Sequence, residues 1–149
     1  MRTIVAAAAM LIAAGTGAHA QTNPSELKWG PAPPAFPAGA EMAVLSGDPG
    51  KTGPFAVRLR IPPGFKVPAH SHPSDEFVTV ISGEISLGMG DKLDQAKGKK
   101  LEQGGFAQAT AGMNHYVWTG AGAVVQVNSV GPFEMTYANP ADDPRKTAK

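Results

Sequence analysis

Three histidines and one glutamate carry the chemistry that the types and spacing of residues in this sequence suggest. His70 and His72 lie two residues apart, Glu76 follows four residues later, and His115 lies further along the chain. On a β-strand, residues i and i+2 point to the same face, so both imidazoles of the pair can reach one ion. A short turn over Pro73–Asp75 can bring the Glu76 carboxylate back beside the two rings. This spacing predicts a metal site.

The ligand types narrow the choice of ion. The chain contains no cysteine, so thiolate ligands and thiolate chemistry are excluded. Imidazole and carboxylate groups suit Fe, Mn, Zn, Cu or Ni better than Ca or Mg, which prefer mostly oxygen ligands. We therefore expect one divalent transition metal and no organic cofactor.

The segments around these residues read as short strands. Residues 55–61 alternate strictly, with Phe55, Val57, Leu59 and Ile61 on one face and arginines on the other. Further β-rich runs cover residues 77–81, 85–89, 116–118, 124–130 and 133–137. Glycine and proline clusters, such as Ser82-Gly83, separate the runs. Short strands divided by such turns predict an all-β sandwich or barrel.

Two sequence motifs resemble those of the cupin superfamily. The first is Gly64-x5-His70-x-His72-x3-Glu76-x6-Gly83, and the second is Gly104-x5-Thr110-x-Gly112-x2-His115-x3-Thr119. The first matches the family pattern at every position. The second has threonine at two positions where the family usually has proline and asparagine, which affects a turn and a strand position but no ligand. The resemblance implies a double-stranded β-helix (jelly-roll) barrel with His70, His72, Glu76 and His115 as metal ligands.

Single residues of these motifs, and their neighbours, also allow simpler interpretations. A lone histidine such as His115 is more often a hydrogen-bonded structural residue than a ligand. Asp75 is the nearest competitor of Glu76, but its side chain would point to the opposite face. Gln108 could donate to a ligand, although a plain strand residue is the simpler reading, and Tyr116 alternates with His115 and is expected to face away from the metal.

The chain divides into four expected regions. The first twenty residues contain an arginine, an apolar run too short to span a bilayer and an Ala-His-Ala cleavage pattern, which is typical of a secretory signal peptide. The regions are a signal peptide (1–20), a proline-rich N-terminal arm (21–40), a cupin barrel (41–138) and an irregular C-terminal tail (139–149). We expect a periplasmic or secreted protein with no membrane association after cleavage. The arm is a candidate for homodimer formation.

Charge and composition limit the partners. Of 13 basic and 12 acidic residues, only Arg2 lies in the signal peptide, so the remaining chain is formally neutral. A neutral chain has no excess of positive charge to bind the phosphates of nucleic acid, so no nucleic-acid partner is expected. We expect a small-molecule ligand or substrate. The first hypothesis is a metal-dependent oxygenase, most simply a dioxygenase, with an isomerase or lyase ranked behind it. The alternative is a non-catalytic metal-binding or small-ligand-binding sensor. No catalytic acid or base is identified.

Overall fold

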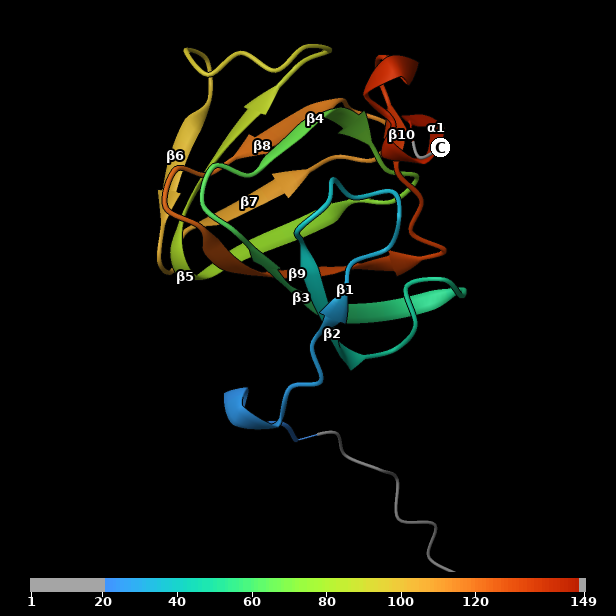
Figure 1. Cartoon of the computed structure of the whole chain (residues 1–149). Helices are drawn as coiled ribbons and strands as arrows, with labels where there is room; N and C mark the ends of the chain where they lie inside the picture. Colours follow the sequence, from blue (N-terminus) through green and yellow to red (C-terminus); the bar gives the residue numbers. More distant parts are fainter. Residues whose placement is uncertain (1–20, 148–149) are drawn as a thin grey trace, which may run out of the picture.

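The structure, a computed structural model that describes residues 21–147, is a curled antiparallel β-sheet (Figure 1). The expected signal peptide lies outside the described residues. The strands are β1 (Gly30–Pro31), β2 (Glu41–Ser46), β3 (Gly53–Ile61), β4 (Lys66–Ser71), β5 (Glu76–Met89), β6 (Lys99–Glu102), β7 (Phe106–Ala109), β8 (His115–Trp118), β9 (Ala123–Gly131) and β10 (Thr136–Tyr137). Short helices are η1 (Pro24–Glu26), η2 (Pro140–Asp142) and α1 (Pro144–Thr147).

The sheet rolls into two layers that share one strand. Its order is β1-β2-β3-β9-β5-β8-β4-β10, and β6 and β7 also pair with β5. The first part of β5 pairs with β9 and β7, whereas its second part pairs with β6 and β8. All of these pairings are antiparallel. The arrangement confirms the predicted all-β, double-stranded β-helix fold.

The long strand β5 crosses from one layer to the other near Gly83. Two β-rich runs divided by a turn at Ser82-Gly83 were expected here, but β5 continues for 14 residues. A bulge between Val80 and Ser82 absorbs the change of direction. Gly83 has φ +73°, and an added Cβ would lie 2.3 Å from the Gly122 carbonyl oxygen. A glycine is therefore required where the two layers meet.

The interior of the barrel is filled by the apolar faces of the strands. The predicted alternation in β3 is confirmed, because Phe55, Val57, Leu59 and Ile61 are all buried. Val125 and Val127 of β9 meet the same core from the paired strand. Burial of each such side chain stabilises the fold by about 1.5–3 kcal/mol relative to exposure.

The two ends of the chain carry more structure than the sequence indicated. The arm forms η1, and its β1 pairs with β2, so the sheet begins inside residues 21–40. The expected irregular tail contains η2 and α1 within residues 139–147. Residues 133–137 form only the two-residue strand β10, because residues 133–135 lie outside any ladder.

Arg145 ties this C-terminal segment to the barrel. Its guanidinium donates to the carboxylate of Asp143 and, at 2.9 Å, to the backbone carbonyl of Met135. Met135 is buried in the core, so the tail packs against the same end of the barrel as β10. Within residues 21–147 no helix is long and apolar enough to cross a membrane.

Candidate metal centre

The four sequence-predicted ligands all come from strand ends at one end of the barrel. His70 lies on β4, His72 follows directly after it, and Glu76 and His115 are the first residues of β5 and β8. The pairing of β4 with β8 sets His70 opposite His115. All four side chains are buried, with at most 8% of any residue exposed.

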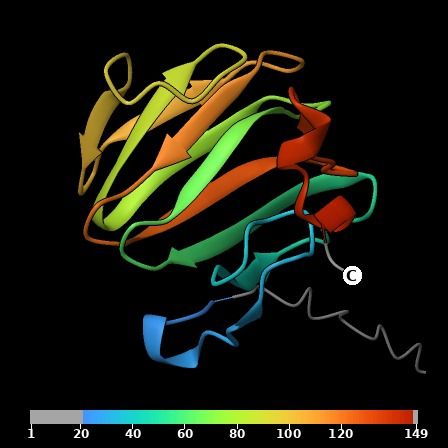
Figure 2. The same cartoon turned by 45° about the horizontal axis from the view of Figure 1, so that its top comes forward.

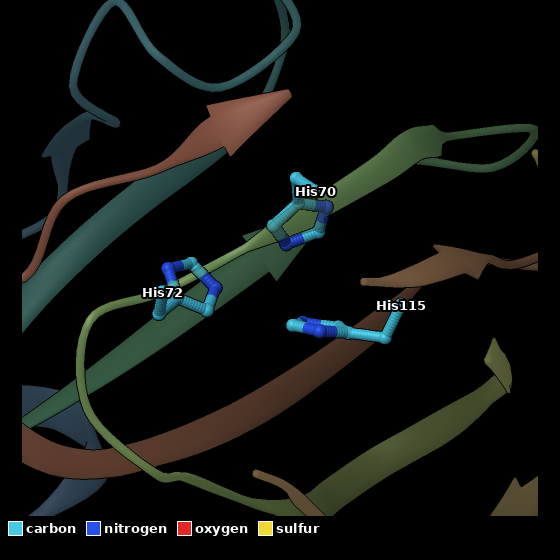
Figure 3. Close-up of side chains that lie close together, drawn as sticks. All are labelled: His70, His72 and His115. Atoms are coloured by element: carbon cyan, nitrogen blue, oxygen red, sulfur yellow. The ribbon is translucent and has the colours of Figure 1, made fainter. Parts of the chain in front are cut away.

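The three imidazoles converge on a common space (Figure 3). The ring of His70 lies with its centroid 4.9 Å from that of His72 and 4.4 Å from that of His115. The centroids of His72 and His115 are 5.3 Å apart. One ring nitrogen from each residue lies within 4.8 Å of the other two, which is close enough for one ion to contact all three.

Backbone carbonyls fix the orientation of every ring. Nδ1 of His70 lies 2.7 Å from the Pro68 carbonyl, and Nδ1 of His72 lies 2.7 Å from that of Glu134. Nδ1 of His115 lies 3.1 Å from the Met113 carbonyl. A carbonyl can only accept, so each Nδ1 carries the proton and each Nε2 presents a lone pair. Metal-binding histidines in proteins are held in this way.

Glu76 borders this group on the side of His72 and His115. Its Oε2 lies 3.1 Å from His115 Nε2 and 3.7 Å from His72 Nε2. The compact set of mutually close nitrogen atoms contains the three histidines, and the carboxylate contacts two of them. The predicted ligand therefore reaches the centre, but it stands next to the trio rather than inside it.

Two buried nitrogen atoms without partners indicate whether the residues of the site fit a metal ion. Among the described residues, His72 Nε2 and His115 Nε2 are the buried side-chain atoms that lack a hydrogen-bond partner of good geometry. An unsatisfied buried polar atom costs about 1–3 kcal/mol. Coordination of a cation would satisfy both lone pairs, so the donor set fits a divalent transition metal.

The electrostatics of the site keep a lone pair available on His70 and His72 and favour charge at His115 and Glu76. Burial, followed by the neighbouring imidazoles, lowers the pKa of His70 to about 3. Burial also lowers the pKa of His72. Burial acts on the pKa of His115 in the same direction, but the close approach and charge of Glu76 outweigh it and raise that pKa. The same contacts overcome burial at Glu76 and lower its pKa, so its carboxylate stays ionised.

Two aromatic residues that sequence reasoning did not single out support the histidines. The Phe133 ring stacks on that of His72, with centroids 4.0 Å apart and an interplanar angle of 18°. The Tyr137 ring lies 5.9 Å from that of His70. Aromatic residues in β-rich runs usually indicate core packing, so the sequence carried no signal for this role.

The other polar candidates have structural roles. Asp75 lies before β5 and accepts hydrogen bonds from Gln108 Nε2 at 3.1 Å and from the Ala111 amide at 2.8 Å. Tyr116 faces away from the histidines, and its hydroxyl donates to the Asp94 carbonyl. Trp118 stacks on Tyr116. These contacts brace loops outside the centre.

A small apolar cavity lies beside the histidines. Its volume is about 50 Å³, and His70, Glu76 and His115 form its polar end. The rest of the lining is aliphatic, aromatic or methionine, including Phe36 from the arm and Met135 from the segment before β10. A bound ion would therefore face a dry, narrow space on this side.

Comparison with known proteins supports the fold and the family. Residues 57–130, which include all four predicted ligands, match the family model of the cupin domain Cupin_2. No curated protein sequence matches the chain significantly.

Solved structures with the same fold come from several bacteria. The polyketide cyclase RemF from Streptomyces resistomycificus is 16% identical, with a TM-score of 0.70 over 85% of this chain and 89% of that one. An RmlC-like cupin from Shewanella frigidimarina is 15% identical, with a TM-score of 0.57 over 74% and 90%. KdgF from a Halomonas species is 16% identical, with a TM-score of 0.55 over 73% and 91%. The barrel, the two motifs and the matching family model agree, and the chain belongs to the cupin superfamily.

Proposed function

We propose that this protein binds one divalent transition-metal ion and acts on a small organic molecule beside it. His70, His72 and His115 would hold the ion through Nε2, and Glu76 would complete the set. The observation that carries the proposal is the convergence of three imidazoles within 4.8 Å, each with Nδ1 directed at a backbone carbonyl. Three neutral rings and one carboxylate would leave the centre with a net charge of plus one.

The residues around the ion define what the protein itself contributes. A bound transition metal supplies Lewis acidity or dioxygen binding. The chain orients the imidazoles through its backbone, holds a negative charge at Glu76 and excludes water with an apolar lining. The titratable groups that line the cavity are all predicted ligands, so no separate general acid or base is assigned.

Oxygenase chemistry is our first choice of reaction, with isomerase or lyase chemistry next. Among proteins that share the fold are a polyketide cyclase, a sugar phosphate isomerase and a DMSP lyase. They illustrate that such barrels host enzymes of several classes. We further propose that the protein works in the periplasm or outside the cell, on the basis of its N-terminal leader pattern.

A second candidate function is a non-catalytic binder or sensor of a metal or small ligand. The volume of the cavity favours it, because about 50 Å³ is far below the roughly 300–1,000 Å³ of typical small-molecule pockets. Oxygen consumption by the iron-loaded protein with phenols, diketones or thiols separates the two. Turnover of any of them supports the enzyme, whereas binding without turnover supports the sensor.

Elemental analysis of the protein tests the metal proposal directly. The full chain is expressed, purified from the compartment in which it accumulates and analysed for Mn, Fe, Ni, Cu and Zn. We expect one transition-metal ion per chain in the wild type and a loss of most of it in His72→Ala.

Gln108→Ala serves as the control, since Gln108 is an exposed polar residue that bonds Asp75 outside the centre. It should retain the wild-type metal content. A wild-type protein without stoichiometric transition metal, or a His72→Ala variant that keeps it, would refute the proposal.

A further inference from the structure

The second part of the N-terminal arm, residues 32–40, lies over one end of the barrel. After β1 the chain runs past the C-terminal segment before it enters β2 (Figures 1 and 2). Within this stretch Ala32 donates its amide to the Ala40 carbonyl, and Phe36 donates to that of Pro33. Phe36 packs against the buried core. The arm thus forms a compact loop whose aromatic residue points into the barrel.

A hydrogen bond fastens this loop next to the candidate metal centre. The Tyr137 hydroxyl donates to the Ala35 carbonyl at 2.7 Å. Burial raises the pKa of Tyr137 to about 12, so the hydroxyl keeps its proton at neutral pH. Because the same ring lies against His70, the arm is tied to a residue that contacts one of the proposed ligands.

Phe36 separates the inside of the barrel from the surface. On its inner side it lines the 50 Å³ cavity with His70, Glu76 and His115. On its outer side it lines an open groove of about 750 Å³ between the arm and the C-terminal segment, with Lys66 at its edge. Of the described residues that line these two spaces, Phe36 is the one that they share.

We propose that Phe36 is the specificity-determining residue of the site, and that it limits ligands to short molecules with a single polar end and an apolar remainder. The inference rests on the proposed function, because the polar end would bind at the metal. A second charged group would lie against aliphatic side chains, where an unpaired charge is strongly disfavoured. A longer apolar tail would meet the Phe36 ring.

Carboxylates of increasing length test this limit. The Co(II)-loaded protein is titrated with acetate, butyrate, hexanoate and succinate, and binding is followed by the cobalt absorption spectrum. For the wild type we expect acetate to bind, hexanoate to bind at least about tenfold more weakly, and succinate to bind more weakly than butyrate. In Phe36→Ala, hexanoate should gain at least about tenfold while acetate stays within about twofold.

Two further variants make the titration specific. Phe106→Ala deletes the same atoms at an exposed position, 58% accessible, on the outside of the barrel and should behave as the wild type. Tyr137→Phe removes only the hydrogen bond that fastens the arm and should give a smaller gain for hexanoate. This variant also provides an answer if Phe36→Ala does not fold.

Metal-free protein separates this inference from the proposed function. Benzene binding, followed by NMR, should occur in Phe36→Ala and not in the wild type, as expected when an apolar cavity is enlarged. If Co(II) is not retained but benzene distinguishes the two, the metal proposal fails and Phe36 still limits the cavity. Equal hexanoate affinities in wild type and Phe36→Ala, or succinate binding as tightly as butyrate in the wild type, would overturn the inference.

Discussion

At the scale of single residues, the carboxylate of Glu76 determines the charge of the centre. The histidines bring no negative charge, and among the described residues the Glu76 side chain is the carboxylate that lies within hydrogen-bonding distance of one of their ring nitrogens. A cation placed among the rings would be attracted by the carboxylate in surroundings that water does not screen. The affinity for a divalent ion should therefore depend strongly on Glu76.

Replacement of Glu76 by glutamine tests this dependence. The change keeps the shape of the side chain and removes its charge, and we expect the affinity for Co(II) or Zn(II) to fall by about 10–100-fold or more. Competition with a chromogenic chelator measures the affinity. Asp75→Asn is the matched control, because it neutralises the adjacent carboxylate, which bonds Gln108 and Ala111 instead, and should change the affinity by less than about twofold. Unchanged affinity in Glu76→Gln would mean that the histidines alone hold the ion.

At the scale of elements, the crossing of β5 between the two layers positions both Glu76 and His115. Its first residue is Glu76, and its last residue pairs with His115 of β8. Any change that disturbs the crossing at Gly83 therefore alters the registers that bring these two residues together. The positive φ of Gly83 and the adjacent Gly122 carbonyl make this point intolerant of a side chain.

Alanine at Gly83 should destabilise the fold more than alanine at Gly104. Both glycines have positive φ, for which an alanine costs about 1–2 kcal/mol, but only Gly83 has backbone atoms within 4 Å of an added Cβ. The clash should add roughly 1–3 kcal/mol. Guanidinium unfolding of the two variants measures the difference in the free energy of unfolding. Equal losses would show that the layers are not tightly packed at this crossing.

Strand patterning made much of this architecture predictable. The alternation of β3 and the His-x-His spacing at the end of β4 depend on the two-residue period of side chains in extended backbone, which the sequence displays directly. The continuity of β5 could not be read, because a glycine at a bulge looks the same in sequence as a glycine at a turn. The role of Phe36 could not be read either, since its position depends on a contact between Ala35 and Tyr137, 102 residues apart.

At the scale of the whole molecule, the site links distant parts of one chain. Its proposed ligands come from β4 and the residue after it, from β5 and from β8, while the arm and the segment before β10 close the cavity. The arm pairs through β1 with β2 of the same chain, so its contacts described here are intramolecular. Formation of a homodimer stays a prediction. An ion held by three separated strands should stabilise the barrel as a unit.

Thermal unfolding with and without metal measures this stabilisation. A ligand present at 100 times its Kd adds about 2.7 kcal/mol to the stability of the folded state. For a chain of this size that corresponds to a rise in Tm on the order of 10 °C. We expect the rise for Zn(II) or Co(II) in the wild type, its reversal by a chelator and its absence in His72→Ala. A similar rise in the variant would point to binding elsewhere.

The backbone carbonyls that orient the imidazoles have an evolutionary consequence. Point mutation cannot delete a carbonyl oxygen, and two of the three acceptors belong to residues, Met113 and Glu134, whose own side chains are exposed. Many different amino acids can replace these two residues while the rings keep their tautomer and their orientation. A lineage built on this barrel can thus remodel its outer face for new surroundings and inherit the same centre unchanged.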